Sequence, residues 1–295
     1  MSGPDPTLPE AKMPSVLHDI AWSGVSHVGK VRKNNEDSFL ALRFNGHDLN
    51  YLGKLGSAST LGSDYVFAVS DGMGGAHSGE FASKIAVDRI TKLLPRSFRL
   101  SAAGVETGYA EVLEELFGSI HSDLLSLGRS YSECAGMGAT LSLCWFRPHW
   151  MCFGHVGDSR IYFMPKAGGI TQVTQDHTHV GWLRRKGEIN EREAREHPRR
   201  NALNQALGAG HQFMEPEIGA VAYVPGDRFI ICSDGLVDGL WDRHIEEIVK
   251  TTPVGPGELT AAQRLVNTSV ENSGKDNVTA VVVEISESKE GPPCP

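Results

Sequence analysis

Short apolar runs recur along this chain, and several of them carry an acidic residue at one end. A lone acid in such a place is usually a turn or helix-entry residue. Its repetition here is harder to explain that way, because strand ends that share one rim of a sheet bring their side chains together. The acids in question are Glu36, Asp37, Asp71, Asp158, Asp234 and Asp276.

Strand-like runs, rich in β-branched and aromatic residues, fall into three groups, at 22–71, 138–173 and 218–285. Two helical stretches, 78–94 and 105–127, separate the first two groups and have apolar residues at mixed spacings of three and four. Short links between neighbouring runs favour antiparallel pairing. We therefore expect an α+β fold in which sheet packs on sheet with helices outside.

The composition limits the partners and the compartment. The 295 residues include 28 basic and 36 acidic side chains, and the net charge of −8 offers no footprint for nucleic acid or an anionic membrane. Five cysteines without C-x-x-C spacing indicate neither a disulfide framework nor a zinc site. The N-terminus is polar and proline-rich, and no apolar run approaches the length of a membrane span. We expect a monomeric, cytoplasmic protein.

The ends of the chain and one internal segment differ from the rest in composition. Residues 1–19 and 287–295 are polar and proline-containing, so we expect disordered tails around one domain at 20–286. Segment 177–207 is highly charged, has a helical pattern and interrupts the strands, which predicts a surface excursion. Residues 46–64 are interpreted as a long surface loop, with no function assigned.

The glycine-rich segment after Asp71 raises the alternative of a nucleotide-binding loop. GGAHSG matches G-x-x-x-x-G, but Glu80 and Phe81 follow where a P-loop has Lys and Ser or Thr. A G-x-G-x-x-G motif starting at Gly72 fails because its last glycine position holds His77. The glycines are better explained as a turn that lets backbone carbonyls point inward beside the aspartate.

Cations would resolve the repulsion among these acids. Several carboxylates on one rim would shift one another's pKa or unfold the site unless positive charge compensates them. Hard oxygen ligands, without Cys or His at metal-ligand spacing, favour Mg²⁺ or Mn²⁺. The sequence thus predicts a hydrolytic centre with more than one metal ion.

Seven motifs together resemble a known family. In order they are VRKNNEDS, VSDGMGGAHSGE, GHVGDSRIY, TQDH, HPRRNALNQALG, CSDGL and GKDNVTAVV, and the match covers about residues 22–285. This set resembles the bacterial branch of the metal-dependent type-2C (PPM) Ser/Thr protein phosphatases. The resemblance implies a four-layer α-β-β-α sandwich, a central antiparallel β-sandwich flanked by helix pairs, with two Mn²⁺ or Mg²⁺ ions at one edge.

The resemblance also assigns the metal ligands by position. Asp71 would bridge the two ions as a catalytic residue. Asp234 and Asp276 would bind one ion, and Glu36 with the Gly72 carbonyl would surround the other.

Further roles follow from the same resemblance. Asp37 would hold metal-bound waters and count among the catalytic residues, and Asn277 would support the site. Asp158, together with Asp234, would take a third and weaker metal. Arg32 falls where the family's phosphate-binding arginine lies, and its planar fork suits phosphate oxygens.

The implied reaction is hydrolysis of phosphoserine and phosphothreonine in proteins. A hydroxide bridging the two metals would attack phosphorus in line with the leaving oxygen, without a phosphoenzyme. The activity would reverse that of a cognate bacterial Ser/Thr kinase. Eukaryotic relatives have a histidine where this chain has Met73, so the general acid stays open between a metal-bound water near Asp158 and His77.

Several alternatives also stay open. The fold could serve a non-catalytic binding domain, although every expected metal carboxylate is present. Cysteine phosphatases need C-x₅-R, which does not occur here. The substrate could instead be a small phosphoester or the phosphoserine of one regulator. Arg184, Arg185 and Lys186 could receive an acidic or phosphorylated partner, or simply form a solvated helix face.

Overall fold

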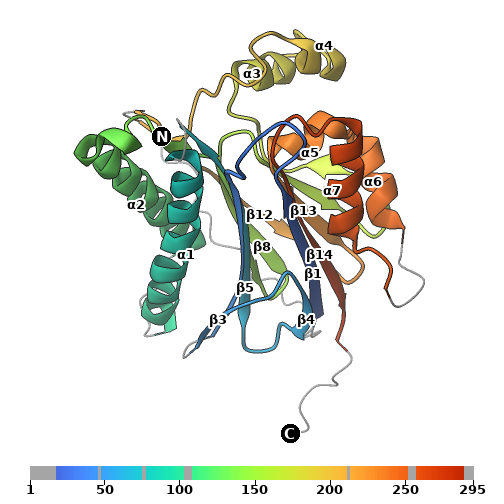
Figure 1. Ribbon diagram of the computed structural model, residues 1–295. Helices are drawn as coiled ribbons and strands as arrows, with labels where there is room; N and C mark the ends of the chain where they lie inside the picture. Colours follow the sequence, from blue (N-terminus) through green and yellow to red (C-terminus); the bar gives the residue numbers. More distant parts are fainter. Residues whose placement is uncertain are drawn as a thin grey trace, which may run out of the picture.

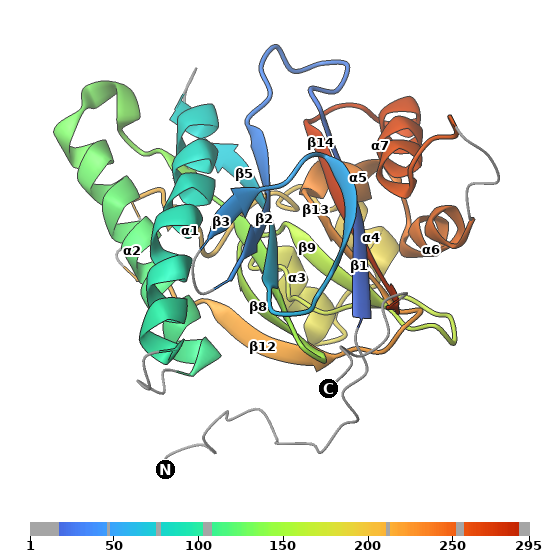
Figure 2. The same cartoon turned by 90° about the horizontal axis from the view of Figure 1, so that it is seen from below.

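Two β-sheets pack face to face between two layers of helices (Figure 1). The computed structural model describes residues 18–45, 48–74, 78–102, 108–210, 213–251 and 257–288. The expected α+β class and its four layers are confirmed. Figure 2 shows the same order of layers from below, with α1 and α2 on one side and α6 and α7 on the other.

The first sheet has six strands in the order β10-β9-β13-β14-β1-β4, and its neighbours are antiparallel. Its long central strands are β14 and β1, which pair along their whole length. The strands are β1 (His18–His27), β4 (Leu55–Ser59), β9 (Arg160–Met164), β10 (Thr171–Gln172), β13 (Arg228–Cys232) and β14 (Val278–Glu287).

The second sheet has eight strands, with β11-β6-β5-β7-β8-β12 in one path and β2 joining β5 to β3. Its pairs are antiparallel as well. The strands are β2 (Asp37–Phe44), β3 (Leu49–Tyr51), β5 (Asp64–Met73), β6 (Gly138–Ala139), β7 (Leu141–Arg147), β8 (Trp150–Val156), β11 (Leu207–Gly208) and β12 (Glu217–Ala222).

Helices cover the outer face of each sheet. Helices α1 (Ser78–Ala102) and α2 (Tyr109–Ser130) pack on the second sheet, and a 3₁₀ turn, η1 (Ser132–Cys134), follows them. Helices α5 (Asp234–Gly239), α6 (Asp242–Lys250) and α7 (Ala261–Asn272) pack on the first. Helices α3 (His179–Arg185) and α4 (Glu191–Glu196) stand off the sandwich. Among the described residues, no helix has the length and apolarity needed to cross a membrane.

Alternating burial explains why the central strands are apolar on both faces. On β5, Tyr65 and Phe67 point into the core between the sheets, whereas Val66 and Ala68 belong to the core under α1 and α2. On β14 the same alternation divides the side chains between the inter-sheet core and the core under α5–α7. Side chains alternate along a strand, so a strand in the middle of four layers buries both sets.

Three expectations need correction. Residues 46–64 are not one loop, because they contain β3 and β4, and β4 pairs with β1. The domain limits of 20 and 286 fall inside strands, since β1 begins at His18 and β14 ends at Glu287. The rest of both predicted tails, apart from Ser288, lies outside the described residues. The third group of strands, at 218–285, also contains helices, because α5, α6 and α7 lie between β13 and β14.

The inter-sheet core provides a stability test. Phe67 is fully buried there, so Phe67→Ala should lower the free energy of unfolding by about 3–5 kcal/mol through lost burial and a cavity. Phe213 is 74% exposed and provides the matched control. Phe213→Ala should change the free energy of unfolding by less than about 0.5 kcal/mol. Urea unfolding measures both, and equal effects would contradict this assignment of the core.

Candidate active site

A cavity of about 230 Å³ lies at one edge of the sandwich, where strands of both sheets end. Asp71 lies near the end of β5, and Glu36 lies just before β2, in the second sheet. Asp234 follows β13 and Asp276 precedes β14, in the first sheet. The residues around the cavity are Arg32, Glu36, Asp71, Gly72, Met73, Gly74, Thr140, Asp158, Asn201, Leu203, Asp234 and Asp276.

The structure therefore brings together seven of the nine site residues proposed from sequence, from Arg32 to Asp276. The other two, Asp37 and Asn277, are buried and hydrogen-bonded to the elements that carry the cavity's acids. Asp37 pairs in register with Asp71 across β2 and β5. Met73 lines the cavity and has no proton to donate, and His77 lies outside the described residues.

Thr140 holds the backbone of Asp71 in place. The Asp71 amide donates to the Thr140 hydroxyl at 3.0 Å, and the Thr140 amide donates to the Asp71 carbonyl at 2.8 Å. A Ser70 hydroxyl bond to the Thr140 carbonyl, 2.6 Å, adds a third link. The Thr140 hydroxyl also shares a hydrogen bond with Ser159, which is adjacent to Asp158. One threonine thus connects the positions of two acids.

The glycines after Asp71 allow a close approach of backbone and carboxylate. A Cβ atom on Gly72 would lie 1.9 Å from the carbonyl oxygen of Gly79, and one on Gly79 would lie 2.9 Å from the carboxyl carbon of Glu36. The Gly72 amide donates to the Glu36 carbonyl at 3.2 Å. Side chains at either glycine would separate Glu36 from the end of β5.

Asn277 connects the two acids that lie before strands. Its Oδ1 accepts the Glu36 amide at 2.8 Å, and its own amide donates to Asp276 Oδ1 at 2.8 Å. Its Nδ2 donates to the carbonyls of Val28 and Asn34, which fixes the loop between β1 and β2. Arg32, on the same loop, is half exposed and donates through Nη2 to Asp276 Oδ2 at 2.7 Å.

The acids are poorly solvated and close to one another. Burial, followed by the charges of Asp37 and Asp234, raises the pKa of Asp71 well above its usual value. Burial and the nearby Asp158 do the same to the pKa of Asp234. Burial raises the pKa of Asp158 to about 7, and that of Asp37 to about 6 in spite of the Ser233 hydrogen bond.

These properties fit divalent cations bound by carboxylates. The Oδ1 atom of Asp234 is buried without a hydrogen-bond partner, which is costly for a carboxylate unless a cation meets it. In the described part of the chain, no three of the cavity's carboxylates place ligand atoms all within 4.8 Å of one another. Such spacing suits ions that keep several waters better than one ion in a tight protein cage.

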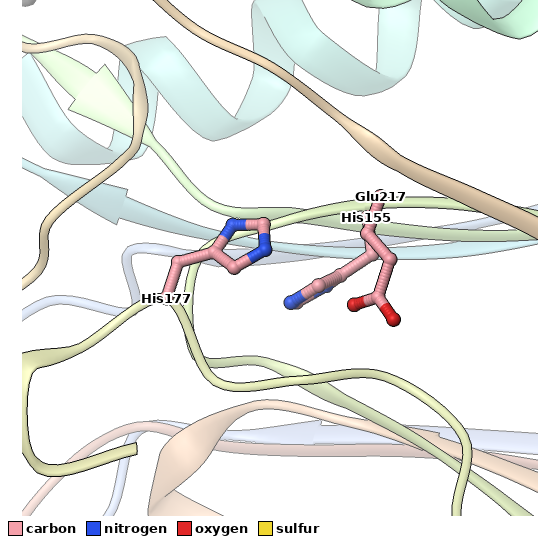
Figure 3. A group of neighbouring side chains, drawn as sticks. All are labelled: His155, His177 and Glu217. Atoms are coloured by element: carbon pink, nitrogen blue, oxygen red, sulfur yellow. The ribbon is translucent and has the colours of Figure 1, made fainter. Parts of the chain in front are cut away.

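A second cluster, at the start of segment 177–207, does have close spacing. His155, His177 and Glu217 place one ligand atom each within 4.8 Å of the others (Figure 3). His155 Nε2 lies 3.1 Å from the carbonyls of Gly157 and Gln175, so it carries the proton, and Nδ1 accepts from Ser142.

The other two members of this cluster are also hydrogen-bonded. His177 Nδ1 accepts the Gly157 amide, and Glu217 accepts the Gln175 amide at 2.7 Å. Burial lowers the pKa of His155 to about 3 and that of His177 to about 4, so both rings are neutral at pH 7. We interpret this cluster as a hydrogen-bonded structural contact between loops and not as a metal site. A metal would have to displace the Nε2 proton of His155 and its contacts with two carbonyls.

Three residues near the site were not found from sequence. Asp238 lies one helical turn after Asp234 and raises its pKa, and the i, i+4 spacing within SDGLVD was a usable signal. Thr140 and Asn201 line the cavity, but no local pattern distinguishes them from other polar residues.

The basic triplet of α3 does not form one surface. Arg185 donates to the Asp176 carbonyl at 3.0 Å, and Lys186 packs on the Trp182 ring at 3.9 Å. Arg184 instead lines a crevice between α3, α4 and the body. The three basic side chains therefore lie in different environments.

Replacing Asp234 should stabilise the metal-free protein. Because the pKa of Asp234 is raised on folding, its ionisation costs stability as pH rises, and Asp234→Asn removes that cost. At pH 8 in EDTA we expect the variant to melt at least about 2–4 °C higher, with a smaller melting shift on adding Mn²⁺. Asp88→Asn, at an exposed ion pair on α1, is the control. A lower melting temperature for Asp234→Asn in EDTA would refute the repulsion.

His177 should contribute to acid unfolding. Its pKa falls from 6.5 to about 4 on folding, so the stability it provides is complete above pH 6.5 and is lost as pH falls toward 4. His177→Asn keeps an acceptor for Gly157 but cannot be protonated. Between pH 7.5 and pH 5 the variant should lose up to about 2 kcal/mol less than the wild type in urea unfolding. Parallel losses would show that His177 does not titrate on unfolding.

Comparisons with known proteins agree with this geometry. Residues 54–267 match the family described as Protein phosphatase 2C. The chain is 30% identical to the serine/threonine protein phosphatase PstP of Mycobacterium tuberculosis over 269 residues, 90% of this chain but 45% of that protein. It therefore spans less than half the length of that relative.

Two further matches cover nearly the whole of their counterparts. The serine/threonine phosphatase stp of Listeria monocytogenes is 28% identical over 89% of this chain and 95% of its own. A crystal structure of the PstP catalytic domain in complex with two manganese ions superposes with a TM-score of 0.70 at 28% identity, covering 92% of this chain and all of that one. This chain belongs to the protein phosphatase 2C family.

Proposed function

We propose that this chain is a metal-dependent protein serine/threonine phosphatase that uses Mn²⁺ or Mg²⁺. The observation that carries the proposal is the ring of poorly solvated carboxylates around one cavity, with an unpartnered buried oxygen on Asp234 and with Arg32 at the rim. The names of the relatives in Mycobacterium and Listeria, and the manganese in the PstP structure, support it.

The ligand assignment follows the positions of the acids. Asp71 is central, because acids that adjoin strands of both sheets raise the pKa of its carboxyl group, and it would therefore help to hold both ions. Asp234 and Asp276 would hold one ion, and Glu36 with the Gly72 carbonyl the other. Asp158, with Asp234, would take a third. When bound, such cations activate water and neutralise the charge on a transferring phosphoryl group.

The protein's own side chains would orient the substrate and the ligands. Arg32 lies at the cavity and can move from Asp276 to phosphate oxygens once a cation compensates that carboxylate. Asp37, held by Ser233 at 2.7 Å, would accept hydrogen bonds from water inside the site. Asn277 keeps Glu36 and Asp276 in register, since it bonds to both.

The biological setting is part of the proposal. The substrates would be phosphorylated proteins, and the chain would oppose a serine/threonine kinase as a cytoplasmic monomer. The net charge of −8 argues against nucleic acid or an anionic membrane as the partner.

Hydrolysis assays test the function directly. The purified protein should release phosphate from phosphothreonine and phosphoserine peptides, and from p-nitrophenyl phosphate, with Mn²⁺ but not with EDTA. Asp71→Asn should reduce kcat by about 10³-fold or more. Arg32→Lys should reduce kcat/KM by about tenfold, because lysine lacks the planar guanidinium that donates to two phosphate oxygens at once. Activity that persists in EDTA, or none with either metal, would eliminate the proposal.

A further inference from the structure

Helix α4 lies in the flap, which is residues 177–207, and one of its side chains, Arg195, carries its hydrogen bonds to the body in the described structure. None of its residues is buried, and in the described part of the chain its side-chain hydrogen bonds to the body all come from Arg195. Arg195 Nη2 donates to the Leu240 carbonyl at 2.9 Å, and Nη1 donates to the Val237 carbonyl. In Figure 1, α4 lies above α5, consistent with this contact.

The chemistry of α5 explains why an arginine occupies this position. The last carbonyls of a helix have no partner inside the helix and carry a partial negative charge. Arg195 satisfies the carbonyls of Val237 and Leu240 at the end of α5, and its guanidinium lies 4.2 Å from the centre of the Trp241 ring. Glu191, one turn earlier on α4, pairs with Nη2 at 3.2 Å and orients the group. A lysine could not bond two carbonyls and stack at once.

The flap closes on itself at its base and is also attached to the body there. Thr178 and Leu203 form a β-bridge, and the Asn204 amide donates to the His177 carbonyl at 2.7 Å. The His177 amide in turn donates to Gly157, next to Asp158, at 2.7 Å. In the described residues the hydrogen bonds between flap and body lie at this base and at Arg195, so replacing Arg195 removes the distal ones.

A crevice of about 80 Å³ separates the flap from the body. Its flap wall includes Arg184, Arg195 and Arg200, and its body wall includes Val237 and Asp238. Asp158, Asn201 and Asp234 belong to this crevice and also to the active-site cavity, so the two spaces adjoin. A polypeptide whose phosphorylated residue enters the cavity would extend over this crevice, whereas a small phosphate ester would not reach it.

We propose that Arg195 is a positioning residue that fixes the flap against α5 and thereby favours phosphorylated polypeptides over small phosphate esters. The proposal rests on the phosphatase function proposed above. Arg195 does not line the active-site cavity, so it acts through the placement of the crevice wall.

Two variants and a control on the same helix test this inference. Arg195→Ala should lower the ratio of kcat/KM for a phosphothreonine peptide to kcat/KM for p-nitrophenyl phosphate by about tenfold, mainly through the KM for the peptide. Arg195→Lys should fall in between, since it keeps the charge and one hydrogen bond. Arg192→Ala should leave the ratio unchanged, because Arg192 pairs only with the exposed Glu196 in the described structure.

Hydrogen exchange separates this inference from the assigned activity. In Arg195→Ala, backbone amides of residues 179–200 should exchange at least about tenfold faster, while those of β5 and β14 keep their protection. Hydrogen exchange does not depend on catalysis. It therefore tests whether Arg195 holds the flap against α5 even if the phosphatase assignment fails. Unchanged exchange in the flap, or equal losses with both substrates, would overturn the proposal.

Discussion

Mutual repulsion among half-buried carboxylates is the constraint on which the rest of this structure depends. Asp71, Asp158 and Asp234 each have a raised pKa because water is largely withdrawn and other acids are near. A flexible chain would relieve this repulsion by moving the acids apart or by unfolding locally. Here the acids follow or precede strands that are apolar on both faces, and those strands cannot shift without opening the core.

Rigid strands alone do not fix the orientation of the carboxylates. Hydrogen bonds from uncharged polar residues do so. Thr140 holds the backbone of Asp71, Ser233 bonds the carboxylate of Asp37, and Asn277 joins Glu36 to Asp276. Each of these links joins segments far apart in the sequence. They keep the acids close enough to share cations even before a cation binds, so part of the ordering cost of metal binding is met during folding.

The acids could be predicted from sequence because each one has a local signal, an apolar run with a carboxylate at its start or its end. Thr140 and Asn201 have no such signal, since their importance arises from which strand or loop faces them. Strand β4 was missed because LGSAS is short, small and on an edge, so packing against β1 rather than propensity decides its conformation. The helix layer formed by α5–α7 was expected only from the family resemblance, and α5, with six residues, is too short for a helical period to be recognised in the sequence.

Helix α5 lies between the active-site cavity and the flap. Its first residue, Asp234, lies in the active-site cavity, and Arg195 caps the carbonyls at its other end. Because α5 has only six residues, a displacement of the flap at Arg195 would reach Asp234 through this helix. Cation binding at Asp234 would in turn stabilise α5, including the carbonyls at its C-terminal end that Arg195 contacts. By linkage the two effects must be reciprocal, so a polypeptide that draws the flap onto α5 should also tighten cation binding.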